Sequence, residues 1–147
     1  MNLFFQLLAG TMMIGLTVTV HGTMLDFVMR NASAWEVLAK RATKRIYKPI
    51  MSIAIVLMVF LAHIIEIWLW AGLFLLLECL PQNTLSEALY FSTITYTTLG
   101  YGDITLAPDF RIMSGIEAAN GFLLFGWTTA FIFEVMSRIY KHEIKSL

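Results

Sequence analysis

The residues with the most specific chemistry in this chain lie at 97–103 and read Thr-Thr-Leu-Gly-Tyr-Gly-Asp. A row of backbone carbonyl oxygens can replace the hydration shell of a cation only when the backbone adopts an unusual, nearly straight conformation. Gly100 and Gly102 permit that conformation, because glycine adopts positive φ at little steric cost. Thr98 adds a hydroxyl at the inner mouth of such a loop, and the Tyr101 ring can brace the loop from behind. The spacing therefore predicts a cation-coordinating loop.

The segment resembles the selectivity filter of potassium channels, which usually reads Thr-Val-Gly-Tyr-Gly-Asp. The resemblance implies that K⁺ is the permeant ion and that no cofactor is required. The filter would comprise residues 98–103, with K⁺ on the carbonyl oxygens of its first four residues and the aspartate as an outer cap that bonds the pore helix or attracts cations. These residues are Thr98, Leu99, Gly100, Tyr101, Gly102 and Asp103.

Some positions around the filter depart from the potassium-channel pattern. Leu99 replaces the common valine and should hold its peptide less stiffly. Tyr90 and Phe91 stand where many relatives carry a tryptophan pair. Phe91 cannot hydrogen-bond the Tyr101 hydroxyl, which leaves Thr95 as an alternative partner. We expect these filter-supporting residues to affect filter stability and inactivation, and not the identity of the ion.

Composition and hydropathy place this loop in a membrane protein. The 147 residues are 59% hydrophobic with a mean hydropathy of +0.75, whereas average globular chains are about 45–50% apolar. Three apolar stretches are long enough to cross a bilayer: Leu3–Val20, Ile50–Leu80 and Ile112–Met136. A formal net charge of zero gives no argument for nucleic acid, and the sequence shows no nucleophile–base set of an enzyme. We therefore expect an all-α membrane protein.

The basic residues predict the orientation of the chain. Of ten Lys and Arg, only Arg111 lies between the second and third apolar stretches. The other nine lie between the first and second stretches or after the third: Arg30, Lys40, Arg41, Lys44, Arg45, Lys48, Arg138, Lys141 and Lys145. The positive-inside rule makes that side cytoplasmic. The N-terminus and the filter then lie outside and the C-terminus inside, as expected for a bacterial inner (plasma) membrane protein.

These observations divide the chain into four predicted segments. An N-terminal transmembrane helix occupies residues 1–30, a basic cytoplasmic linker 31–49, a pore module 50–140 and a short cytoplasmic tail 141–147. The pore module would comprise an outer helix at 50–80, a re-entrant pore helix at 84–97, the filter at 98–103 and an inner helix at 111–138.

Two capping-box patterns mark predicted helix starts, because a hydroxyl and a carboxylate three residues apart can satisfy orphan amides at a helix N-terminus. Ser33–Glu36 predicts a helix within the linker, and Thr84–Glu87 predicts the start of the pore helix. The linker helix would lie in the membrane interface with its basic face on anionic lipid. The alternative is a basic linker that only fixes topology. Pro49 marks the turn into the second span.

One chain supplies one filter strand, and a ring of carbonyls needs several. The resemblance to potassium channels implies four copies, so we expect a cyclic homotetramer in the lipid bilayer, without nucleic acid. A second hypothesis is a non-conducting regulatory subunit that assembles with other potassium channel subunits.

The inner helix contains further candidates for gating. Gly121 and Gly126 could act as hinges, or as small residues that permit close helix packing. Glu134 could form a ring of four carboxylates near the inner mouth, or pair with Arg138 four residues on.

Ionisable groups also occur at membrane depth. His63 and Glu66 lie three residues apart on one helix face, and Glu117 and Asn120 repeat that spacing. They could pack between helices or sense protons, since histidine changes charge near neutral pH. A metal site would need more ligands than the sequence obviously brings together. His21, at the end of the first predicted span, is interpreted as an interfacial residue.

Overall fold

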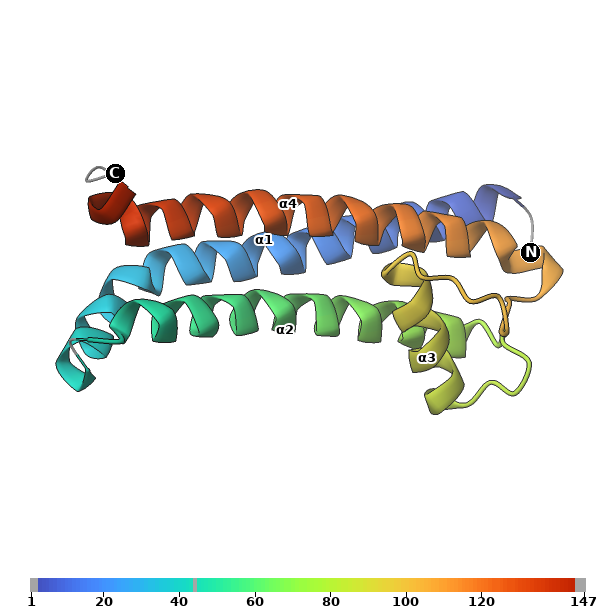
Figure 1. Cartoon of the computed structure of the whole chain (residues 1–147). Helices are drawn as coiled ribbons and strands as arrows, with labels where there is room; N and C mark the ends of the chain where they lie inside the picture. Colours follow the sequence, from blue (N-terminus) through green and yellow to red (C-terminus); the bar gives the residue numbers. More distant parts are fainter. Residues whose placement is uncertain (1–2, 44, 145–147) are drawn as a thin grey trace.

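Three long helices lie side by side, and a short helix packs across one end of them (Figure 1). The computed structural model describes residues 3–43 and 45–144, and the side chains of these residues except 42 and 141–144. The helices are α1 (Leu3–Ala42), α2 (Tyr47–Leu76), α3 (Leu85–Tyr96) and α4 (Arg111–Ile144), with a 3₁₀ turn at Pro108–Phe110 before α4. No strand occurs within the described ranges. The expectation of an all-α fold is confirmed.

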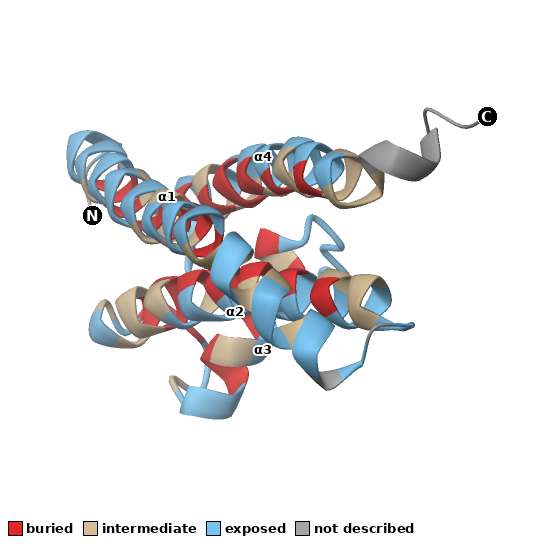
Figure 2. Ribbon diagram, turned by 90° about the vertical axis from the view of Figure 1, so that its left-hand side faces the viewer, coloured by how far each residue is buried: buried red, intermediate tan, exposed pale blue. Residues whose placement is uncertain are grey.

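Helices α1, α2 and α4 are each long and apolar enough to cross a membrane. At 1.5 Å per residue, the 30 residues of α2 extend about 45 Å, which exceeds a hydrocarbon core of roughly 30 Å. Buried residues line the inward faces of the helices, and the outward faces are exposed (Figure 2). The exposed face of α2 is apolar and includes Leu57, Phe60 and Trp68. Such a face suits lipid contact, and each of the three predicted spans falls in a helix long and apolar enough to cross a membrane.

Two apolar clusters hold the bundle together. One surrounds α3 and includes Met13, Trp70, Phe74, Phe91 and Leu124. The other lies towards the α1–α2 connection and consists of Val28, Met51, Ile55 and Val135. Because both clusters contain residues of α1, this first helix packs against the other two long helices along much of its length.

The predicted break between a first span and a separate linker helix was wrong. Helix α1 continues without interruption to Ala42, so Ser33 and Glu36 lie inside it. The side-chain amide of Asn31 donates to the Phe27 backbone carbonyl at 2.8 Å, and the Glu36 carboxylate pairs with the Lys40 ammonium at 2.5 Å. Both contacts span one helical turn. A capping box needs a non-helical first residue. Ser33 is helical, because the helix already runs through the preceding turn.

The ends of α2 also differ from the predicted 50–80. Pro49 lies within the first turn of α2, where a missing N–H is tolerated because it has no intrahelical acceptor. At the other end the helix stops at Leu76, and positive φ at Glu78 and Asn83 shapes the following loop. The side-chain amide of Asn83 donates to the Leu75 backbone carbonyl at 3.2 Å, which satisfies one of the last carbonyls of the helix.

Helix α3 begins at the second capping pattern. Thr84 is its N-cap, and the Thr84 hydroxyl accepts a hydrogen bond from the Glu87 amide at 3.3 Å. The Glu87 carboxylate accepts from the backbone amide of Gln82 at 2.9 Å. In a full capping box this carboxylate would accept from the backbone amide of Thr84, so only the Thr84 half of the pattern is present, and Glu87 bonds two residues earlier instead.

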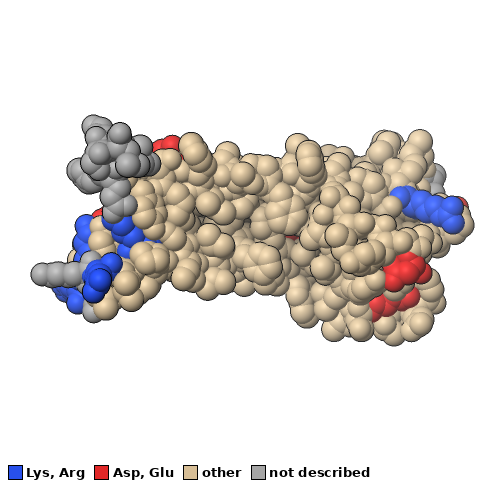
Figure 3. Space-filling view, viewed as in Figure 1, with Lys and Arg blue, Asp and Glu red and all other residues tan. Residues whose placement is uncertain are grey.

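Helix α4 extends past the predicted end at 138 and includes residues 141–144 of the predicted tail; residues 145–147 lie outside the described part of the chain. Lys and Arg side chains gather at the end of the bundle where α1 joins α2 (Figure 3). Helix α3 and the loop after it lie at the opposite end (Figure 1).

Candidate functional site

The loop at 97–103 follows α3 directly and has an alternating backbone. Thr98, Gly100 and Gly102 have φ values of 60°, 53° and 78°, whereas Leu99 and Tyr101 do not have positive φ. The two glycines adopt this conformation readily, and Thr98 pays a steric penalty because it carries a Cβ. Alternation of left- and right-handed residues allows successive carbonyl groups to face the same side of the chain.

Two backbone hydrogen bonds fasten the loop to the end of α3. The Thr98 amide donates to the Thr95 carbonyl, and the Gly100 amide donates to the Ile94 carbonyl, each at 2.9 Å. Within the described part of the chain, the carbonyl oxygens of residues 98–101 accept no hydrogen bond. The loop thus uses its amides for anchoring and leaves its carbonyls available to a ligand.

Asp103 is tied to α3 at the other end of the loop. The Tyr90 hydroxyl donates to the Asp103 carboxylate at 2.7 Å. This bond raises the pKa of Tyr90, because it stabilises the protonated phenol beside a carboxylate. Of the two outcomes left open for Asp103, the structure shows a bond to α3, the helix predicted as the pore helix.

The other supporting residues have different positions. Phe91 is buried against Phe74, with ring centroids 5.4 Å apart, and belongs to the core behind α3. Thr95 holds the loop through its carbonyl, and no hydrogen bond joins it to Tyr101 among the described residues. Tyr101 itself is 68% exposed in the single chain.

A hollow of about 590 Å³ lies between the loop and the first turns of α4. Thr98, Gly100 and Gly102 line it on one side, and Gly115 and Ala118 line it on the other. A Cβ at Gly115 would meet no atom within 4 Å. This hollow is large enough to receive side chains of a neighbouring molecule.

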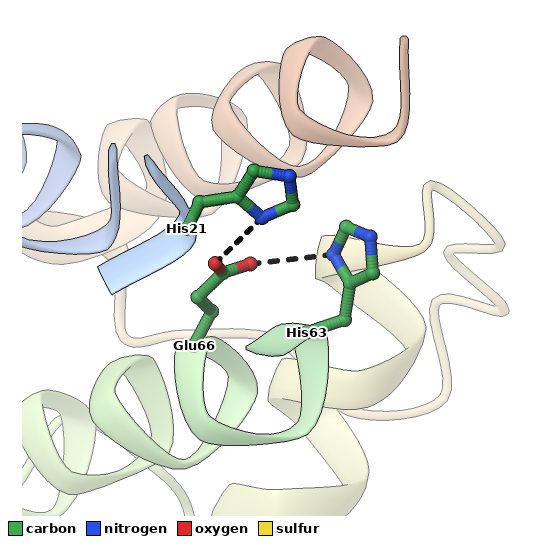
Figure 4. A group of neighbouring side chains, drawn as sticks. All are labelled: His21, His63 and Glu66. Carbon is green, nitrogen blue, oxygen red and sulfur yellow. Dashed lines mark hydrogen bonds and ion pairs between the residues drawn. The ribbon is translucent and has the colours of Figure 1, made fainter. Parts of the chain in front are cut away.

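Behind α3, a central polar cluster joins all four helices. It consists of His21 from α1, His63 and Glu66 from α2, Tyr96 from α3 and Thr128 from α4, all of which are buried. His21 Nδ1 lies 2.9 Å from one Glu66 carboxylate oxygen, and His63 Nδ1 lies 3.2 Å from the other (Figure 4). The Tyr96 hydroxyl donates to Glu66 and lies 3.0 Å from His63 Nδ1. The Thr128 hydroxyl lies 2.8 Å from His63 Nε2 and 3.1 Å from His21 Nε2.

Two interpretations of the polar residues were therefore wrong. His21 is a fully buried partner of Glu66, not an interfacial residue. His21, His63 and Glu66 each place one donor atom within 4.8 Å of the others, so more metal-type ligands converge than the sequence indicated. The missed signal was the absence of a helix breaker after residue 20, which lets α1 continue and moves His21 towards mid-span.

The match to a known family agrees with this arrangement. The model of a family described as ion channel matches residues 53–138, which is more than half of the chain. The chain belongs to this ion channel family. No curated protein and no solved structure matches the chain significantly. The matched residues run from α2 through α3 and the loop into α4, whereas α1 with His21 lies outside the match.

In this ion channel subunit, α4 passes very close to α3 at Gly121. A Cβ at Gly121 would lie 2.1 Å from the Tyr96 carbonyl oxygen, so only glycine fits there. A Cβ at Gly126 would meet no atom within 4 Å. Packing thus explains Gly121 within one chain, while a hinge at either glycine stays a prediction.

Glu134 makes the local pair that the sequence offered as one alternative. Its carboxylate lies 2.7 Å from the Arg138 guanidinium, and both side chains are more than half exposed. A ring of four such carboxylates stays a prediction.

Glu117 and Asn120 link α4 to two other helices of the channel subunit. Ser92 of α3 donates a hydrogen bond to one Glu117 carboxylate oxygen. The Asn120 amide donates to the Thr17 hydroxyl of α1 at 2.9 Å. These contacts fit the packing interpretation, and the pair links helices as His63 and Glu66 do, closer to the end of the bundle that carries the loop at 97–103.

Proposed function

We propose that this ion channel subunit conducts K⁺ passively through a homotetrameric pore. The observation that carries the proposal is the loop at 98–103, where positive φ alternates along the chain and the carbonyls of residues 98–101 accept no hydrogen bond. Carbonyl rings of this kind can replace the hydration shell of K⁺. The filter residues would be Thr98, Leu99, Gly100 and Tyr101, with the Thr98 hydroxyl at the innermost site.

The need to satisfy these carbonyls supports the tetramer. Non-helical backbone at membrane depth survives only where it is buried in protein or lines a water-filled cavity. Leu123, Gly126, Ala130 and Glu134 are all exposed on α4 of the single chain. In a fourfold ring, that face of α4 would line the conduction path below the filter.

The distribution of charge supports the proposed orientation. Basic side chains gather at the end of the bundle away from the filter (Figure 3). The positive-inside rule places that end in the cytoplasm and the filter outside. On the cytoplasmic side, the basic residues near 40–48 would contact anionic lipid headgroups. Each such Lys or Arg would contribute about 1 kcal/mol to the attraction to the membrane surface. The membrane would be a bacterial plasma membrane.

The test is ion flux from potassium-loaded liposomes with sodium outside. We expect K⁺ efflux from the wild type and its loss in Gly100→Ala, because alanine is strained at a φ of 53°. Gly72→Ala is the matched control, since Gly72 lies within a helix and a Cβ there meets no atom within 4 Å.

Sodium flux equal to potassium flux would contradict the selectivity. No flux from a confirmed tetramer over a range of pH and lipid compositions would favour the regulatory subunit instead. Such a subunit would dock through its first span and basic linker. That alternative has less support, because α1, which contains the first span, packs along α2 and α4 of its own chain.

A further inference from the structure

We propose that the central polar cluster binds a divalent transition-metal ion such as Zn²⁺. His21 and His63 offer imidazole nitrogens and Glu66 offers a carboxylate, with the three donors within 4.8 Å of one another. Two histidines and a glutamate form a known zinc donor set, and imidazole also suits the neighbouring late transition metals. All three side chains are at most 3% exposed, so no bulk water competes for the donors.

The donors lie close enough for side-chain rotation to bring them onto one ion. In a tetrahedral site with metal–ligand distances of about 2.0–2.1 Å, neighbouring ligand atoms lie roughly 3.3 Å apart. His21 lies 2.9 Å from one Glu66 oxygen and His63 lies 3.2 Å from the other, and one donor atom from each residue lies within 4.8 Å of the others. The side chains would therefore close inwards on binding to share one ion.

Tyr96 supplies the fourth ligand. Its hydroxyl oxygen lies 3.0 Å from His63 Nδ1 and bonds to the same Glu66 carboxylate. The phenol oxygen would then complete a four-ligand set with the two histidines and Glu66. The Glu66 carboxylate would offset part of the charge of the ion, which matters because an uncompensated charge at membrane depth is costly.

Thr128 lies behind both histidines and is placed to support them as ligands. With both Nδ1 atoms on the metal, both Nε2 atoms carry hydrogens, and the Thr128 oxygen lies within 2.8 Å and 3.1 Å of them. Its two lone pairs accept both hydrogens. Thr128 would thus hold both rings in the orientation that directs Nδ1 at the metal.

Such an ion would fasten α1 to the pore module. His21 comes from α1, the other histidine and the glutamate from α2, and Tyr96 from the last residue of the pore helix. The metal would therefore fix the helix that carries the filter loop against both lipid-facing helices. This role goes beyond ion conduction and does not depend on the identity of the permeant ion.

The experiment measures metal content. Full-length protein from zinc-supplemented cultures is purified in detergent and analysed by elemental mass spectrometry. We expect about one Zn²⁺ per chain in the wild type and a loss of Zn²⁺ in His21→Gln and Glu66→Gln. Glu117→Gln is the matched control, because Glu117 is equally buried but bonds Ser92 instead. Thr128→Val, which removes only the acceptor behind the ligands, should weaken zinc affinity about 10–100-fold.

The wild type alone keeps the test decisive if a variant fails to fold. A chelator should lower its thermal unfolding temperature and added Zn²⁺ should restore it. A wild type without stoichiometric transition metal, whose unfolding responds to neither treatment, would overturn the proposal and leave the cluster as a hydrogen-bonded packing network. Metal content is measured without any flux, so this proposal and the proposed function fail separately.

Discussion

Gly121 shows how strongly a single atom constrains this channel subunit. A Cβ at this position would lie 2.1 Å from the Tyr96 carbonyl oxygen and 2.9 Å from its carbon. Both are backbone atoms of the last residue of α3, directly before the loop at 97–103, so they cannot move aside as a side chain could. The close approach of α4 sets the position of the end of α3.

We predict that Gly121→Ala destabilises the protein by about 1–3 kcal/mol, the usual cost of overpacking. Alanine has the higher helix propensity by up to about 1 kcal/mol, so the loss would come from the clash alone. Thermal unfolding in detergent measures the effect, with Gly126→Ala as the control on the same helix. Equal stability of both variants would show that α4 can shift away from Tyr96 without cost.

At the scale of helices, the two capping patterns have different fates. Thr84 caps α3, whereas Ser33 lies inside α1. We predict that Thr84→Ala costs about 0.5–2 kcal/mol and that Ser33→Ala costs nothing measurable, because alanine is the better interior residue. Denaturation of the two variants side by side checks this pair. A larger loss for Ser33→Ala would indicate a helix start that the continuous α1 does not have.

The same comparison shows what sequence could and could not predict. Length and hydropathy predicted three spans, and the glycines at 100 and 102 predicted the positive φ of the loop. Thr98 has positive φ without a glycine, and its strain comes from the anchoring bonds to α3, which a local pattern does not reveal.

The bond between His21 and Glu66 joins residues 45 positions apart. Packing of α1 creates that bond, and no spacing rule within a helix predicts it.

At the scale of the whole molecule, the exposed loop and α4 face predict assembly. Four chains of 16.7 kDa give a protein mass of about 67 kDa for a closed fourfold ring. We expect this mass from light scattering of the detergent-solubilised protein after subtraction of the detergent. A stable monomer would contradict the tetramer, since its filter carbonyls would have no partners.

The link between His21 and Glu66 has a consequence for how the protein enters the membrane. An ionised acidic residue near the middle of an inserting helix costs about 2.5–3.5 kcal/mol on insertion scales. Glu66 imposes this cost on α2, and its partner His21 belongs to α1, which is synthesised first. Helix α1 would thus already lie in the bilayer, with His21 available to bond Glu66, when α2 inserts. Without α1, the residues that match the family, 53–138, would therefore insert poorly. The helix that they need for insertion lies outside the match.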